Sequence, residues 1–172
     1  MSDPRSNISL RNPWHLLATG FGSGLSPVVP GTMGTLASVP FYLMLAQLPV
    51  TLYLVVIVVA SFIGIKICQV TSDDMQVHDH GSIVWDEFAG FWITMLIVPL
   101  CQLPVFDWKW LATGFVLFRF FDMLKPWPIS WLDKRVHGGF GIMIDDVVAG
   151  VMAAICLAAI GHWLQWFPSV SA

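Results

Sequence analysis

The feature that most constrains this chain is the length of its charge-free segments. Residues 12–65 contain no Asp, Glu, Lys or Arg, and none of these occurs after Asp146. Only 11% of the 172 residues are charged and 56% are hydrophobic, whereas an average soluble domain carries roughly 25% charged residues. We therefore expect an all-α, polytopic integral membrane protein, a helical bundle that forms one domain over residues 1–172, with residues 1–11 as a flexible tail.

Glycine and proline residues divide the apolar sequence into four or five predicted helices. The segments are 35–48, 51–70, about 85–106, 108–124 and about 146–167. Because about 20 residues are needed to cross the hydrocarbon core, the short segment 35–48 either spans the membrane or only enters it.

Charged residues fall mainly on one side of this predicted bundle. If all five helices cross, the N-terminus, residues 71–85 and residues 125–144 share one face, and residues 49–51 and 101–107 lie opposite. The positive-inside rule places the first face in the cytoplasm, because it carries Arg5, Arg11, Lys125, Lys134 and Arg135. Nearly every carboxylate lies there too, which favours a site at that face over a path through the membrane.

The remaining composition excludes several classes of protein. A net charge of −3 and few, scattered basic residues argue against a nucleic-acid partner. The three cysteines, Cys68, Cys101 and Cys156, are far apart and show no CxxC spacing. A disulfide framework or a zinc site therefore has no support.

Two pairs of carboxylates have a structural explanation as well as a functional one. Asp86–Glu87 and Asp145–Asp146 both open apolar segments, and carboxylates are favoured at helix N-termini. Capping explains Asp122 poorly, because this residue is near a predicted helix C-terminus. Arg119, three residues earlier, could neutralise Asp122 as a structural ion pair. Ionisable residues at membrane depth nevertheless favour a functional interpretation.

The functional interpretation gathers the carboxylates around a divalent cation. Such a cluster would crowd negative charge unless a cation compensated it, and Mg²⁺ prefers oxygen ligands. Arg119 and Lys125 then suit a phosphate group. The glycine-rich loop 20–34, which contains Thr32 and Gly34, is either a turn between helices or a phosphate cradle of backbone N–H groups. The carboxylates concerned are Asp79, Asp86, Glu87, Asp122, Asp145 and Asp146.

Four stretches, in this order and at this spacing, resemble the bacterial phosphatidylglycerophosphatase A family. They are "GFGSGLSPVVPGTMGTL" (20–36), "HDHGSIVWDEFAG" (78–90), "RFFDMLKPWPI" (119–129) and "GIMIDDVVAG" (141–150). The resemblance runs from about Asn12 to His162. It implies Mg²⁺-dependent hydrolysis of phosphatidylglycerophosphate to phosphatidylglycerol and inorganic phosphate, in phospholipid biosynthesis. It also implies a multi-pass enzyme of the bacterial inner membrane.

The resemblance further implies that all six carboxylates match the family's acidic motif positions, and that Arg119 and Lys125 match its basic ones. From their chemistry, we expect Asp86, Glu87, Asp145 and Asp146 to supply most of the Mg²⁺ shell. Arg119 and Lys125, together with Thr32 and Gly34, would bind the substrate phosphate. Asp79 or Asp122 would orient water or attack phosphorus directly, and the sequence favours neither route.

Two classes other than an enzyme remain open from the residues alone. A small ion or metal transporter would use intramembrane carboxylates along a path, and a non-enzymatic membrane subunit would use small residues for helix contact. Among enzymes, a phosphatase acting on phosphatidic or lysophosphatidic acid, or a phosphotransferase, is a further alternative. The sequence predicts no oligomeric state.

Overall fold

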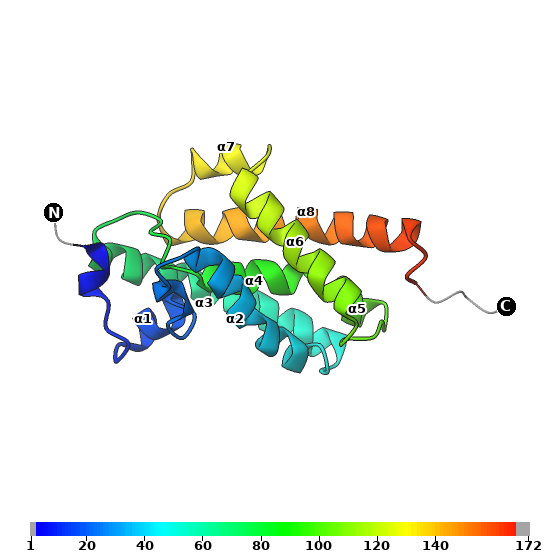
Figure 1. The fold of residues 1–172 in the computed structure, drawn as a ribbon. Helices are drawn as coiled ribbons and strands as arrows, with labels where there is room; N and C mark the ends of the chain where they lie inside the picture. The colour runs from blue at the N-terminus through cyan, green and yellow to red at the C-terminus, as the bar shows by residue number, and fades with distance from the viewer. Residues whose placement is uncertain (1–2, 168–172) are drawn as a thin grey trace.

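The computed structural model describes residues 3–167, and no strand occurs in this range. Figure 1 shows helices that run roughly between two ends of the molecule, with the two chain termini at opposite ends. The elements are the 3₁₀ helices η1 (Pro4–Asn7) and η2 (Ser23–Leu25) and the α-helices α1 (Pro13–Ala18), α2 (Pro30–Leu45), α3 (Val50–Met75), α4 (Trp85–Thr94), α5 (Ile97–Leu100), α6 (Trp108–Leu124), α7 (Ile129–Asp133) and α8 (Gly138–Trp163).

Helix α4 is the centre of the fold. It contacts α2, α3, α6 and α8 (Figure 1), and every residue from 86 to 92 is buried. Phe88 and Phe91 belong to the main hydrophobic core, together with Phe118 of α6. Because the first turn of α4 is acidic, burial of this helix carries Asp86 and Glu87 into the interior.

Helices α4 and α8 approach each other at two glycines. A Cβ atom added to Gly150 would lie against the backbone carbonyl of Gly90, so only glycine allows this separation. Both helices run away from the end of the molecule that carries the N-terminus (Figure 1). Asp86 and Asp146 each precede the contact by four residues, about one helical turn. The close crossing therefore sets these two carboxylates beside each other.

The all-α prediction is confirmed, and α6 has the predicted bounds 108–124. The segment 85–106, predicted as one span, is instead divided, because α4 ends at Thr94 and α5 covers only Ile97–Leu100. Pro99 has no N–H to donate to the carbonyl of residue 95, which disfavours a continuous helix. By length and composition, α3 and α8 are the helices long and apolar enough to cross a membrane among residues 3–167. Four or five crossings are therefore not confirmed.

Helix α8 begins eight residues earlier than predicted, at Gly138. Asp145 and Asp146 consequently lie about two turns inside the helix, where the backbone N–H groups already have partners. The interpretation of this pair as an N-terminal cap is wrong. Capping remains compatible with Asp86 and Glu87, which occupy the first turn of α4.

Contacts from distant residues explain the early start of α8. The N–H of Gly138 donates to His78 Nε2 at 2.9 Å, and the N–H of Gly139 donates to Gln69 Oε1 at 2.7 Å. A Cβ atom on Gly139 would clash with the backbone carbonyl of Ile65 in α3. The glycines that suggest a loop in the sequence thus permit a helix pressed against its neighbour.

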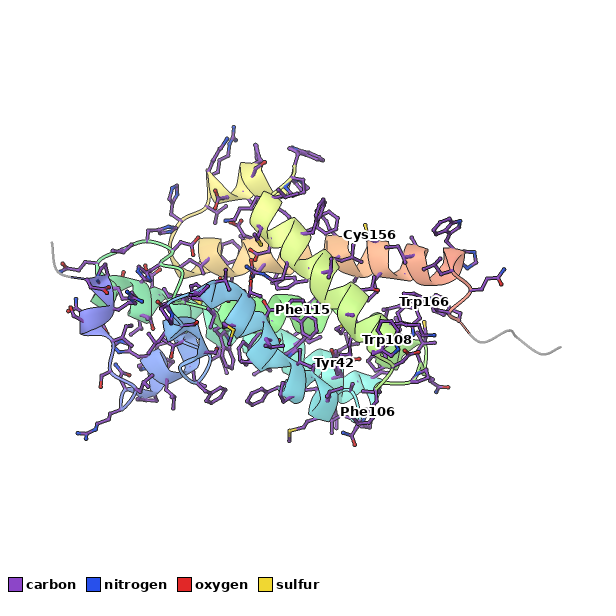
Figure 2. The ribbon with its side chains drawn as sticks, viewed as in Figure 1. Tyr42, Phe106, Trp108, Phe115, Cys156 and Trp166 are labelled. Atoms are coloured by element: carbon purple, nitrogen blue, oxygen red, sulfur yellow. The ribbon has the colours of Figure 1, made fainter. Side chains whose placement is uncertain are left out.

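The two ends of the molecule differ in chemistry. Aromatic side chains gather at the end near the C-terminus, where Figure 2 shows Phe106, Trp108 and Trp166. Phe106 and Trp108 are largely exposed, and Trp166 packs edge-on against Trp110. The start of α4 and the end of α6, which carry Asp86, Glu87 and Asp122, lie toward the other end (Figure 1).

Candidate active site

Charged side chains from three helices, α4, α6 and α8, meet beside the first turn of α4. Arg119 and Asp122 project from the last turns of α6, and Lys125 follows directly after that helix. Glu87 comes from α4 and Asp146 from α8. Three of the four sequence motifs therefore contribute charged side chains to one site.

Arg119 is the basic residue of the buried part of this site. Its Nη1 contacts Glu87 Oε1 at 3.3 Å and donates to Thr35 Oγ1 at 3.4 Å. It also forms the predicted ion pair with Asp122. The Arg119 Nε atom is buried and has no hydrogen-bond partner among the described residues. All hydrogen bonds and ion pairs of Arg119 with described residues use Nη1, so the guanidinium keeps other N–H donors that no described residue uses.

Lys125 is held between two carboxylates at the surface of the site. Its Nζ donates to Asp145 Oδ2 at 3.0 Å and also contacts Asp133 of α7. Hydrogen bonding to the Lys125 ammonium holds the pKa of Asp133 below its usual value. Partial burial lowers the pKa of Lys125, but hydrogen bonds to Asp133 and Asp145 outweigh this and raise it overall. Lys125 therefore stays charged at any physiological pH.

The adjacent aspartates of α8 face different partners. Asp146 is buried close enough to Asp86, Glu87 and Asp122 for their charges to interact, and its carboxyl lies within hydrogen-bonding reach of Asp122. Asp145 instead faces Lys125. Consecutive residues on a helix point about 100° apart around its axis. Asp146 can therefore face the buried carboxylates while Asp145 faces Lys125.

Several carboxylates of the site have oxygen atoms that accept no hydrogen bond from a described residue and could bind a cation. Within residues 3–167 no group of three or more His, Cys, Asp or Glu side chains is already arranged to hold a metal ion. Four buried carboxylate oxygens nevertheless lack a donor among the described residues: Asp86 Oδ1, Glu87 Oε2, Asp145 Oδ1 and Asp146 Oδ2. Buried acceptors without donors are costly, and hard cations such as Mg²⁺ bind carboxylate oxygen. The donor set is therefore chemically suited to Mg²⁺.

The glycine-rich segment reaches the site as a helix rather than as a loop. The loop predicted over 20–34 ends at Val29, because Pro30 is preorganised for the first position of α2. Thr32 lies in the first turn of α2, where backbone N–H groups have no intrahelical partner. Gly34 lies two residues further and four residues after Pro30, so its N–H belongs to the helix. A Cβ on Gly34 would lie 2.9 Å from Glu87 Oε2, which makes Gly34 a packing residue for that carboxylate.

Asp79 lies in the loop between α3 and α4. It is exposed, has a positive φ of 49° and accepts no hydrogen bond within the described range. Its charge nevertheless acts on both Asp86 and Lys125. Asp79 is thus a carboxylate at the open side of the site.

Three residues at the site lie outside the predicted set. Asp133 pairs with Lys125, Thr35 accepts from Arg119, and a Cβ on Gly31 would clash with Glu87 and lie 3.0 Å from Arg119 Nη2. Gly31 and Thr35 fall within the first quoted motif, next to Thr32 and Gly34. No pattern in the sequence pointed to Asp133, because its partner Lys125 is eight residues away, across the turn between α6 and α7.

Comparison with known proteins identifies one matching family. The family model for phosphatidylglycerophosphatase A matches residues 16–161. The chain is 58% identical to the phosphatidylglycerophosphatase A of Escherichia coli over 92% of its own length and 89% of that protein. It is 48% identical to the Haemophilus influenzae protein of the same name, over 95% and 98% of the two chains.

A third relative has a different name. A Bacteroides thetaiotaomicron protein, provisionally named a phosphatidylinositol-3-phosphatase, is 37% identical over 87% of this chain and 93% of its own. No solved structure matches the chain. The motifs, their convergence and the near-complete matches lead to one conclusion: the chain belongs to the phosphatidylglycerophosphatase A family.

Proposed function

We propose that this protein is a Mg²⁺-dependent phosphatidylglycerophosphatase, which hydrolyses phosphatidylglycerophosphate to phosphatidylglycerol and inorganic phosphate in phospholipid biosynthesis. The observation that carries the proposal is 58% identity to the Escherichia coli enzyme across nearly the whole chain. The two apolar helices α3 and α8 support a membrane enzyme. We further propose that it is a multi-pass protein of the bacterial inner membrane, with this site at the cytoplasmic face.

The carboxylates Asp86, Glu87 and Asp146 would hold Mg²⁺, with Asp145 Oδ1 available as a further ligand. The unused buried oxygens of these residues support the assignment. When bound, Mg²⁺ supplies Lewis-acid polarisation of a phosphoryl group and lowers the pKa of bound water. Without a cation, burial of several carboxylates together would be strongly unfavourable.

Arg119 and Lys125 would bind the phosphate of the lipid. Nη1 of Arg119 contacts Glu87, Asp122 and Thr35, so the unused Nε and Nη2 donors of the guanidinium have a defined direction. A preorganised guanidinium stabilises charge that develops on phosphoryl oxygens without reorganising during the reaction. The first-turn N–H groups of α2, at Gly31 and Thr32, could add further donors.

Asp79 is our choice for the group that orients the attacking water. The alternative, Asp122, is committed to Arg119 and lies close to Asp146. Asp79 is exposed and accepts no hydrogen bond within the described range, so it can accept a proton from water at the open side of the site.

Phosphate release by the purified protein in detergent tests this function. We expect release from phosphatidylglycerophosphate with Mg²⁺ and none after removal of divalent metals. Phosphatidic acid, lysophosphatidic acid and phosphatidylinositol 3-phosphate serve as comparison substrates, the last because of the Bacteroides relative. A transporter or a structural subunit would release no phosphate under any metal condition, which would refute the proposal.

A further inference from the structure

Each cation of the site is shared by two carboxylates, and the two cases differ in exposure. Arg119 is paired with Glu87 and Asp122, whose side chains are 10% and 15% exposed. Lys125 is paired with Asp145, which is 6% exposed, and with Asp133, which is 40% exposed. Asp133 is therefore the one carboxylate of the four that water can solvate readily.

This difference decides which ion pair can open. Separating a buried carboxylate from its cation leaves an unpaired charge in the interior, which is strongly unfavourable. An exposed carboxylate exchanges its partner for water at little cost. Asp133 also lies at the end of α7, a helix of five residues that is joined to the rest by turns. Lys125 can therefore leave Asp133 while it stays on Asp145.

We propose that Asp133 is a displaceable counter-ion for Lys125. It positions the ammonium beside Asp145 while no substrate is bound, and the phosphomonoester of the lipid takes its place on Lys125. This inference rests on the proposed phosphatase function and concerns substrate binding only. Asp133 is a positioning residue, because it acts through Lys125 and contacts no reacting atom.

The exchange favours a phosphomonoester over other anions. A phosphomonoester carries up to two negative charges and several strong acceptor oxygens, so it binds an ammonium more strongly than one carboxylate does. A phosphodiester carries a single charge, so replacing Asp133 with it yields no electrostatic gain. The terminal phosphate of the substrate therefore replaces Asp133 on Lys125, whereas the diester of the product lipid does not.

Binding of inorganic phosphate to the purified full-length protein tests the inference directly. In Asp133→Asn the competing charge is gone, so we expect phosphate to bind about three- to fivefold more tightly than in the wild type, the range that one exposed ion pair supports. The KM for phosphatidylglycerophosphate should fall by a similar factor, with kcat changed less than about twofold. Asp133→Glu should restore wild-type phosphate binding.

Matched variants separate this role from a structural one. Asp3→Asn removes an exposed carboxylate that is paired with Arg5 outside the site and should leave phosphate binding unchanged. In a Lys125→Met background, Asp133→Asn should no longer alter phosphate binding. If Asp133→Asn does not accumulate, Asp133→Ala removes the same charge. Phosphate binding equal to or weaker than wild type in these variants would overturn the inference, whereas an inactive wild type would refute the proposed function instead.

Discussion

At the scale of single residues, Asp86 and Asp146 distinguish a capping role from a metal-binding role. Asp86 lies in the first turn of α4, where a carboxylate also stabilises the helix. Asp146 lies about two turns inside α8, where that benefit is absent. Loss of a cap costs about 1 kcal/mol of stability, whereas loss of a metal ligand removes several kcal/mol of transition-state stabilisation.

We therefore predict that Asp86→Asn and Asp146→Asn each reduce phosphatase activity by at least about a hundredfold. Asn keeps the side-chain volume and removes the charge. In metal-free detergent solution, Asp146→Asn should not lower the melting temperature, because a buried carboxylate without a donor or a cation is itself unfavourable. Activity assays and thermal unfolding in detergent measure both effects, with Asp3→Asn as the control. More than about a tenth of wild-type activity in either variant would remove that residue from the metal site.

A second prediction at the scale of single residues concerns Gly31. In Gly31→Ala the added methyl would meet Glu87 Oε1 and both Arg119 Nη atoms, so the pair must separate. We expect activity to fall about tenfold, while the intrinsic helix preference gains roughly 0.5–1 kcal/mol. Gly81→Ala is the matched control, because its added Cβ meets only Pro30 Cγ, at 3.7 Å. Equal activity of the two variants would contradict a role for Gly31 in shaping the site.

At the scale of elements, the crossing of α4 and α8 positions the carboxylates. In Gly150→Ala the new Cβ would press on the backbone of Gly90, which cannot move aside as a side chain can. Overpacking of this kind costs roughly 1–3 kcal/mol. We predict a melting temperature lower by several degrees and a larger loss of activity than of stability, because Asp86 and Asp146 move apart.

Gly114→Ala is the control for this crossing. Its added Cβ would meet only side-chain atoms, Met95 Sδ and Leu157 Cδ2 (3.3 Å), which can move aside, so the helices need not separate. We expect activity close to wild type and a smaller thermal shift, measured in the same detergent. A Gly150→Ala variant that behaves like Gly114→Ala would show that the close crossing does not position the site.

Several elements could be predicted from sequence because their signals are local. The bounds of α6 follow from the Asp107 side chain, which accepts from the Lys109 N–H, and from Pro126 after its end. The Arg119–Asp122 pair follows from helical spacing. The start of α8 could not be predicted, because its first N–H groups are paired with His78 and Gln69, about 60 and 70 residues away. Glycine suggests a break, and tertiary contacts overrode this preference.

At the scale of the whole molecule, the two ends differ in their side chains. The acidic motif residues lie toward one end, here the acidic end, and the exposed Phe106 and Trp108 lie at the other, here the aromatic end (Figure 2). The loop between α3 and α4, which carries Asp79, lies at the acidic end together with the end of α6 and with α7, whereas α5, which Cys101 follows, lies at the aromatic end (Figure 1). If the positive-inside rule orients the protein, the acidic end faces the cytoplasm. A lipid phosphatase of this orientation would meet substrate headgroups only on the cytoplasmic side of the membrane.

The native cysteines make this orientation testable. Cys101 is exposed, whereas Cys68 is buried and Cys156 lies part-buried along α8 (Figure 2). We predict that a membrane-impermeant maleimide labels Cys101 in intact spheroplasts, and that Cys101→Ser abolishes this labelling. In the Cys101→Ser background, Lys134→Cys, at an exposed position after α7, should react only after the membrane is permeabilised. Labelling of Lys134→Cys in intact spheroplasts would reverse the orientation and place the site outside the cytoplasm, because Lys134 adjoins Asp133 and hence the Lys125 side of the site.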